Sequence, residues 1–83
     1  MKQGTGLSTV VVNEIREERR RQRIKWGPQT HSDLYWLAIL SEEVGEAAKA
    51  ALEEHPGHLQ TELVQVAAVA CAWLDQLRTG KAV

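Results

Sequence analysis

Glu43, Glu46 and Glu62 are the residues best suited to chemistry, because apolar residues flank each of them at helical spacing. Glu43 and Glu46 are three residues apart, which places both side chains on one helical face with Cβ atoms about 5–6 Å apart. Carboxylates among apolar neighbours lose hydration, and a hard divalent cation such as Mg²⁺ or Mn²⁺ offsets that loss. The pattern favours a divalent-metal site between two helices. The ordinary alternative is that these glutamates are solvated, as most glutamates are.

Each acid shares a helical row with apolar residues, and a wholly apolar stripe runs beside each row. The first acid-bearing row reads Trp36, Ile39, Glu43, Glu46 and Ala50, and the second reads His58, Glu62, Gln65, Val69 and Ala72. The neighbouring stripes are Leu37, Leu40, Val44, Ala48 and Ala51, then Leu59, Leu63, Val66, Ala70, Trp73 and Leu77. This 3–4 spacing predicts helices at both places.

The chain is predicted to begin with an arm and a first helix. Residues 1–7 contain two glycines and no periodic pattern, which predicts a flexible N-terminal arm ahead of a single helical domain over residues 8–80. Ser8 or Thr9 can cap the first helix. Trp26-Gly27-Pro28 ends it, because glycine suits a C-cap and proline cannot continue a helix.

Two further helices complete the predicted fold. One extends over about 33–54 and the other over about 58–78, separated by the turn signal His55-Pro56-Gly57. No strand pattern occurs, so the predicted class is all-α: three helices, with the second and third forming an antiparallel hairpin. The stretch 66–72 is small and apolar nearly all round, so it must pack on more than one side. We therefore expect a homodimer or homotetramer in which a second chain completes the bundle.

Composition narrows the class of protein further. With 43% hydrophobic and 25% charged residues, the chain has the balance of a globular domain. Its net charge of −1 gives no drive toward nucleic acid or an anionic membrane, so neither partner is expected. No apolar run approaches the ~20 residues of a membrane span. The single Cys71 excludes an intramolecular disulfide and a cysteine-based zinc site. A cytoplasmic setting is the expectation.

Three blocks of the sequence resemble the MazG-like, all-α nucleoside triphosphate pyrophosphohydrolases. The acidic block is Ser-Glu-Glu-Val-Gly-Glu-Ala over 41–47, followed by Leu-Gln-Thr-Glu-Leu over 59–63, against a family signature of Glu-Glu-x-x-Glu and then Glu-x-x-Asp. The upstream block, which consists of 18–22 followed by 25–31, and the stretch 62–73 resemble small phage and actinobacterial members. The resemblance covers roughly 15–77.

The resemblance implies Mg²⁺-dependent hydrolysis of a nucleoside triphosphate to a monophosphate and pyrophosphate, with Mn²⁺ as a substitute. It implies that Glu43, Glu46 and Glu62 ligate the metal and that water attacks phosphorus. Glu42 matches the leading acid of the motif, which helps to activate that water, and Glu43 is assigned a catalytic as well as a ligand role.

Gln65 is the one departure from the family signature, since it occupies the position of the final aspartate. Its carbonyl can ligate a hard cation but carries no charge. No nearby acid replaces it: Asp75 points about 140° from Glu62, and Asp33 lies roughly 15 Å along the helix from Glu43. The alternative is a nucleotide-binding or helical interaction module with a weakened, non-catalytic metal site.

Lys25, Trp26 and Gln29 are the candidate substrate-binding residues, since they lie in a block that resembles the family. Trp26 can stack on a nucleobase or fill the corner between the first two helices, and the sequence does not decide between these. His31 is a further possible contact, with loop capping as the alternative. Nearby basic residues could bind phosphate, but pairing with acids at i, i+3 and i, i+4 is the simpler interpretation; they are Arg19, Arg20, Arg21 and Arg23.

Overall fold

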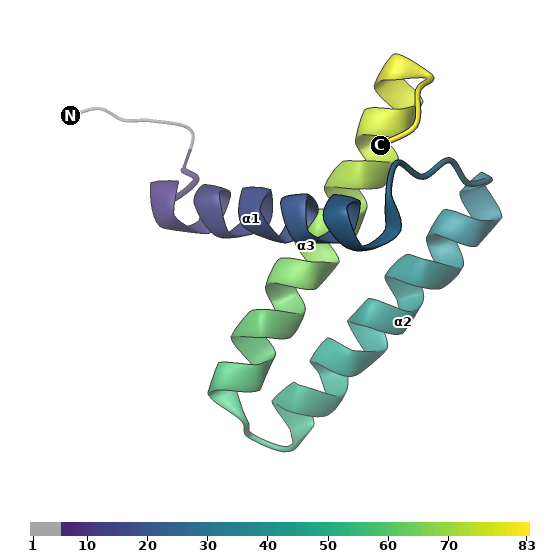
Figure 1. Ribbon diagram of the computed structural model, residues 1–83. Helices are drawn as coiled ribbons and strands as arrows, with labels where there is room; N and C mark the ends of the chain where they lie inside the picture. The colour runs from purple at the N-terminus through teal and green to yellow at the C-terminus, as the bar shows by residue number, and fades with distance from the viewer. Residues whose placement is uncertain (1–5) are drawn as a thin grey trace.

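The computed structural model describes residues 6–83, which form three α-helices and no strand (Figure 1). These are α1 (Thr9–Trp26), α2 (Asp33–Leu52) and α3 (Pro56–Thr79). The predicted all-α class with three helices is confirmed. Most of the predicted N-terminal arm, residues 1–5, lies outside the described residues. Among residues 6–83, no helix is long and apolar enough to cross a membrane.

The helix ends follow local capping chemistry. The Ser8 side chain accepts a hydrogen bond from the Val11 amide at 3.4 Å, so Ser8 caps α1. Gly27 closes α1 with φ of 72°, a conformation that costs glycine little. Ser32 caps α2 by accepting from the Tyr35 amide at 3.2 Å.

The last helix starts earlier than the sequence predicts. It begins at Pro56 instead of about residue 58, because proline suits the first helical position, where no amide donor is needed. The His55 ring supplies the cap, with Nδ1 accepting from the His58 amide at 3.2 Å. The second helix ends at Leu52, slightly before the predicted end, and Glu54 turns the chain with φ of 54°.

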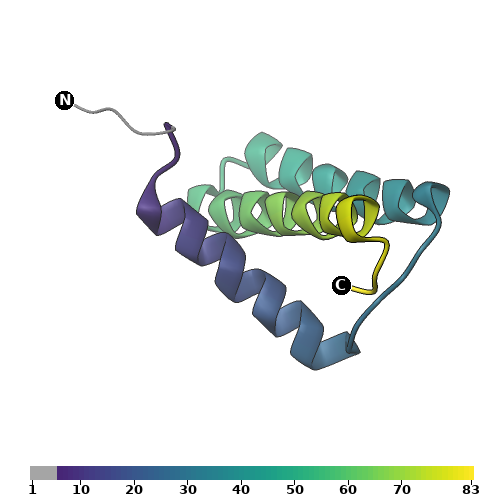
Figure 2. The same ribbon diagram turned by 90° about the horizontal axis from the view of Figure 1, so that it is seen from above.

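Two of the three helices lie side by side in one layer, and the third crosses one of them. Helices α2 and α3 lie side by side, joined by a short turn, and α1 packs across α3 (Figures 1 and 2). The C-terminus returns to the loop 27–32 between α1 and α2 (Figure 1). This arrangement leaves a space bordered by α1, that loop, α2 and α3.

The fully buried residues between α2 and α3 come mainly from the acid-bearing rows, and the apolar stripes are only partly buried. Trp36, Val69 and Ala72 are buried together with Val83, while Ala47, Ala50 and Ala68 let the two helices approach closely. The stripes are divided: Leu40 and Trp73 pack against this core, whereas other members are about half exposed, namely Leu37, Val44, Leu63 and Leu77 at 47%, 49%, 52% and 60%. Cys71, although its neighbours in the sequence are small and apolar, is also exposed in the single chain.

Gln76 ties the loop 27–32 to α3. Its side-chain oxygen accepts from the His31 amide at 3.0 Å and from Trp36 Nε1 at 2.8 Å, and its nitrogen donates to the His31 carbonyl at 2.8 Å. The backbones of Gln29 and Val83 exchange two further hydrogen bonds of 2.8 and 2.9 Å. These contacts fix the segment that carries Gln29 and His31.

Replacing Gln76 by leucine should destabilise the fold by about 2–4 kcal/mol, because three partly buried hydrogen bonds are lost and Trp36 Nε1 is left unpaired. Urea unfolding at fixed protein concentration measures the change. Gln60→Leu, at an exposed position of the same helix, is the matched control and should change stability by no more than about 0.5 kcal/mol. Equal losses in the two variants would contradict the role given to Gln76.

Candidate metal centre

A cavity of about 410 Å³ lies where α1, the loop 27–32, α2 and α3 meet. Five predicted site residues line it: Trp26, Gln29, Glu42, Glu43 and Gln65. The carboxylates come from the middle of α1 and α2, and the aromatic residues come from the end of α1, the loop 27–32 and the start of α2. The cavity therefore has an acidic part and an aromatic part.

Glu43, Gln65 and Glu62 form the inner contact of the acidic part. Glu62 is 6% exposed, and Gln65 lies between it and Glu43. With its nitrogen toward the acids, the Gln65 amide donates to Glu62 Oε1 at 2.8 Å and to Glu43 Oε1 at 3.2 Å. This orientation is assigned from hydrogen bonding, because an oxygen placed there would face only acceptors.

The donor set fits a hard divalent cation. If the Gln65 amide turns over, its oxygen joins two carboxylate oxygens at the same 2.8 and 3.2 Å separations. Three oxygens from two helices at this spacing repel one another unless a cation lies among them, and Mg²⁺ and Mn²⁺ take such ligands. The Gln65 amide therefore donates to both acids in one orientation and could act as an oxygen ligand in the other.

The electrostatic environment of Glu43 also favours a nearby cation. Burial raises the pKa of Glu43, and the negative charge of Glu62 raises it further, followed by the charges of Glu42, Glu18 and Glu46. Each of these effects disfavours the ionised carboxylate. A cation near Glu43 would reverse the balance, because opposite charge favours the ionised form.

The four predicted ligands are not gathered equally. Glu43 and Glu62 both contact Gln65, whereas Glu46 is exposed and contributes least to the raised pKa of Glu43. Of the four, only Glu43 and Gln65 line the cavity. Within residues 6–83, no three His, Cys, Asp or Glu side chains converge closely enough to hold a metal as they stand. The Gln65 amide, which lies between Glu43 and Glu62, is the group that would have to turn.

Helix α1 contributes an acid that sequence reasoning missed. Glu18 lines the cavity, and its side chain is 13% exposed. Its Oε1 accepts from Arg21 at 2.7 and 3.0 Å, and its Oε2 accepts from Gln22 Nε2 at 3.2 Å. The available signal was the row Val11, Ile15, Glu18, Gln22 and Lys25, whose apolar start indicates which face of α1 is turned inward.

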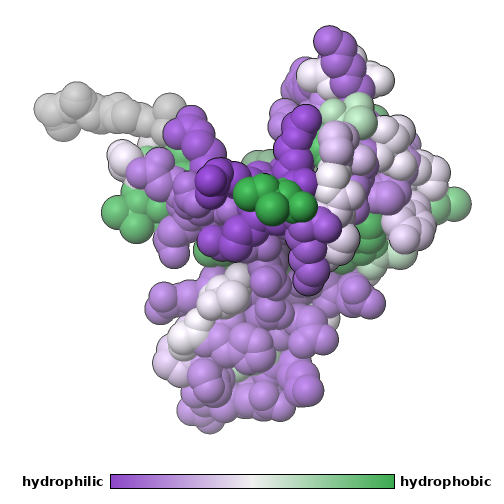
Figure 3. Space-filling model, viewed as in Figure 1, coloured by the Kyte–Doolittle hydropathy of each residue, from purple (hydrophilic) through white to green (hydrophobic). Residues whose placement is uncertain are grey.

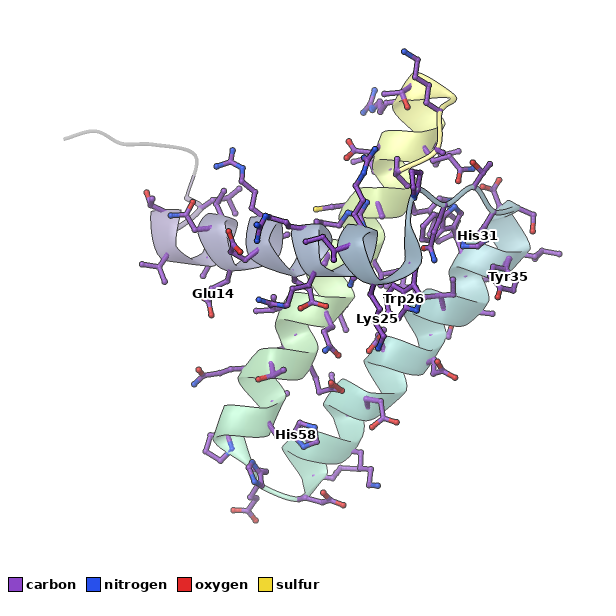
Figure 4. All side chains as sticks on the ribbon, in the orientation of Figure 1. Glu14, Lys25, Trp26, His31, Tyr35 and His58 are labelled. Atoms are coloured by element: carbon purple, nitrogen blue, oxygen red, sulfur yellow. The ribbon has the colours of Figure 1, made fainter. Side chains whose placement is uncertain are left out.

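The aromatic part gathers around His31 (Figure 4). The centroid of the His31 ring lies 4.4 Å from the ring centroid of Tyr35 and 4.8 Å from that of Trp36. Its Nε2 is buried and has no hydrogen-bond partner among the described residues. Trp26 is 56% exposed, and Lys25 Nζ lies 4.9 Å from its ring centroid. Trp26 is thus largely exposed and lines the cavity.

Comparisons of this chain with protein-family models, curated proteins and solved structures found no match. The MazG-like resemblance therefore depends on the chain's own motifs, and the function depends on the geometry of the site.

The raised pKa of Glu43 predicts how stability responds to pH. Its folded pKa lies above the unfolded value of about 4.3, so the folded state holds the proton more tightly. Stability is then lost as pH rises above the unfolded value. In EDTA, the melting temperature should fall more steeply for the wild type than for Glu43→Gln as the pH rises above the unfolded pKa.

Added Mg²⁺ should flatten the wild-type pH profile and leave that of Glu43→Gln nearly unchanged. Glu53→Gln, at an exposed position of the α2 C-cap, is the control and should follow the wild type. A wild-type profile that Mg²⁺ does not change would contradict cation binding at Glu43.

Proposed function

We propose that this chain is a Mg²⁺-dependent nucleoside triphosphate pyrophosphohydrolase of the MazG-like type. The observation that carries the proposal is the contact of Glu43 and buried Glu62 through Gln65, beside a cavity with an aromatic wall. Buried acids are costly in a domain of this size, and the motif blocks put the same residues in a metal site. The substrate is a nucleoside triphosphate, and the products are a monophosphate and pyrophosphate.

Glu43, Glu62 and Gln65 hold the metal in this proposal, and Glu46 joins them from the exposed rim of α2. Bound Mg²⁺, or Mn²⁺ in its place, neutralises phosphate oxygens and lowers the pKa of the attacking water. Glu42 lines the cavity and accepts the proton of the water that attacks the α-phosphorus. The bond from that phosphorus to the bridging oxygen breaks, and pyrophosphate leaves.

The aromatic part receives the nucleoside. Trp26 stacks on the base, and the unpartnered His31 Nε2 hydrogen-bonds to the base or sugar. Lys25 binds phosphate from the rim, and Gln29 contacts the nucleotide from the loop that Gln76 fixes. The support for this assignment is the exposed Trp26 ring and the buried, unpaired nitrogen in one cavity.

The same proposal includes assembly in the cytoplasm as a homodimer or homotetramer. Figure 3 shows apolar patches that interrupt a mainly hydrophilic face. Leu34, Leu37 and Val44 on α2 and Leu63, Leu74 and Leu77 on α3 are all about half exposed or more. A second chain that packs on these outward stripes of the antiparallel α2–α3 hairpin would bury them.

A nucleotide-binding or helical interaction module without turnover is the second candidate. The observation that favours it is the small number of negative charges where Glu43 and Glu62 meet Gln65. Gln65 is neutral, and Glu46 faces solvent. Such a protein would bind nucleotide and metal but release no pyrophosphate.

A panel of nucleoside triphosphates with Mg²⁺ or Mn²⁺, assayed for pyrophosphate, tests the enzymatic proposal. Turnover should fall by at least ~100-fold in Glu43→Gln and Glu62→Gln, since each loses a charge that acts only when the metal is bound. Glu53→Gln should keep full activity. Nucleotide-induced thermal stabilisation without pyrophosphate release would favour the binding module instead.

Sedimentation equilibrium tests the assembly. The wild type should be dimeric or larger. The double variant Leu37→Glu, Leu63→Glu should raise the dissociation constant of the assembly by at least ~100-fold, because two charges then enter an apolar interface. Ile24→Glu changes a 72% exposed residue on α1 and should leave the mass unchanged. A monomeric wild type would exclude the proposed interface.

A further inference from the structure

A second cavity, of about 600 Å³, lies between α1 and the C-terminal half of α3, where the two helices diverge beyond their crossing (Figure 1). It shares no lining residue with the acid-bearing cavity. We call it the arginine wedge, because its charged lining residues are four arginines of α1 and one acid of α3: Arg16, Arg19, Arg20, Arg23 and Asp75. Four positive charges against one negative charge leave a formal charge of +3, in a chain whose net charge is −1.

The four arginines lie side by side on one face of α1. Positions 16, 19, 20 and 23 fall within about 100° around a helix axis and within about 10 Å along it. Like charges at this spacing repel one another. Val12 and Ile15 are partly buried and add apolar surface to the same wedge. The wedge thus combines a dense positive row with an apolar floor, and the row is costly unless negative charge compensates it.

Acids of the chain compensate the row only in part. Pairing with acids one turn away is the simpler interpretation of the sequence, and Arg20 does pair with Glu17 at 3.6 Å. Both side chains of that pair are exposed, so it contributes little. The other three arginines of the row form no ion pair within residues 6–83, namely Arg16, Arg19 and Arg23. Three guanidinium groups are therefore left without an ion-pair partner.

Arg19 is the most enclosed of the three, since it is partly buried while Arg16 and Arg23 are exposed. Burial lowers the pKa of the Arg19 guanidinium; Asp75 opposes this change, and the positive charge of Arg23 adds to it. The one hydrogen bond that Arg19 donates goes to a neutral acceptor, Gln22 Oε1, at 2.9 Å. A bound anion would supply the negative charge that this environment lacks.

The residue types indicate which anion fits. The guanidinium group presents a planar fork that binds two phosphate oxygens at once, and all four cations of the row are arginines and not lysines. The row is only about 10 Å long, and the chain as a whole carries no excess of positive charge. A short chain of phosphates, with several negative charges close together, matches this row better than a long nucleic acid strand, which would extend past it.

We propose that the arginine wedge binds the di- or triphosphate group of a small molecule, with Arg16, Arg19 and Arg23 on the phosphate oxygens. Val12 and Ile15 provide apolar contact for the group that bears the phosphates. An inorganic oligophosphate and a nucleotide share this chemistry. The site uses none of the acids of the candidate metal centre, so it does not depend on the proposed function.

Calorimetric titration of the full chain with inorganic tripolyphosphate, in EDTA and at low salt, tests the inference. EDTA removes divalent cations, so the acid-bearing cavity cannot hold the phosphates through a metal. Arg16→Gln and Arg23→Gln should each lower the affinity about tenfold, because each removes a charge-assisted hydrogen bond from an exposed position where folding is not at risk. Arg21→Gln is the matched control: it removes the same charge from the same helix, but Arg21 pairs with Glu18 at 2.7 Å and lies outside the wedge. Its affinity should stay within about twofold of the wild type.

Cys71 reports where the phosphates bind. It is the single cysteine of the chain, is exposed, and lines the wedge from α3. Tripolyphosphate should slow the alkylation of Cys71 by N-ethylmaleimide in the wild type and in Arg21→Gln. The double variant Arg16→Gln, Arg23→Gln should show no protection at the same concentration. Equal protection in the double variant and the wild type would contradict the assigned site.

The remaining outcomes separate the sources of the phosphates and the two proposals. A nucleoside triphosphate that binds more tightly than tripolyphosphate in EDTA and protects Cys71 identifies a nucleotide as the occupant, whereas equal affinity identifies the phosphate chain alone; both support the site. Tighter binding of a single-stranded oligonucleotide would overturn it in favour of nucleic acid. A wild type that does not bind tripolyphosphate, or an equal loss in Arg21→Gln and Arg23→Gln, also overturns it. Nucleotide hydrolysis without this binding contradicts the inference alone, and this binding without hydrolysis leaves the inference standing while the enzymatic proposal fails.

Discussion

Like-charge repulsion among partly buried carboxylates is the constraint around which this small fold is arranged. Glu62 is 6% exposed, and the pKa of Glu43 beside it is raised by burial first and by neighbouring charge second. Both effects disfavour the ionised form of the Glu43 carboxylate. The Gln65 amide supplies donors to both acids, and Arg21 and Gln22 do the same for Glu18. In the proposed enzyme, the cation supplies the remaining compensation.

The acids stay inward because the helices are held together elsewhere. Trp36, Val69, Ala72 and Val83 pack beside the site, and alanines further along let α2 and α3 approach closely. Gln76 joins Trp36 to the loop that carries His31, so one side chain fixes both the core and the aromatic part of the cavity. Core packing and site geometry are therefore coupled in this chain.

The outward stripes follow from the same constraint. With most of the acid-bearing rows turned inward, part of each apolar stripe is left facing solvent, as the half-exposed Leu37 and Leu63 show. A domain of 83 residues buries too little surface to leave such rows uncovered without a cost in stability. Covering them with a second chain would recover apolar burial that the site prevents within one chain.

Sequence determined the helices, because their signals are local. Ser8, Ser32 and Gly27 mark helix ends by hydrogen bonding and by φ alone, and the 3–4 spacing identifies the helices between them. The start of α3 was placed two residues late, because Pro56 can either end a turn or open a helix. The sequence also predicts that Glu43 and Glu46 lie on the same side of their helix, since the i, i+3 spacing fixes their relative direction.

Only the tertiary structure decided which faces meet. Hydrophobicity favours Leu37 and Leu63 over the mixed rows, yet the mixed rows pack inward, because small residues and Trp36 fit there. The crossing of α1 over α3 brings Glu18 to Glu43, a pairing of residues 25 positions apart that no local pattern encodes. The hydrogen bond between the Gln76 side chain and the His31 amide joins residues 45 positions apart. Contacts of this kind depend on the relative placement of whole helices, which the sequence specifies only through the summed packing of the fold.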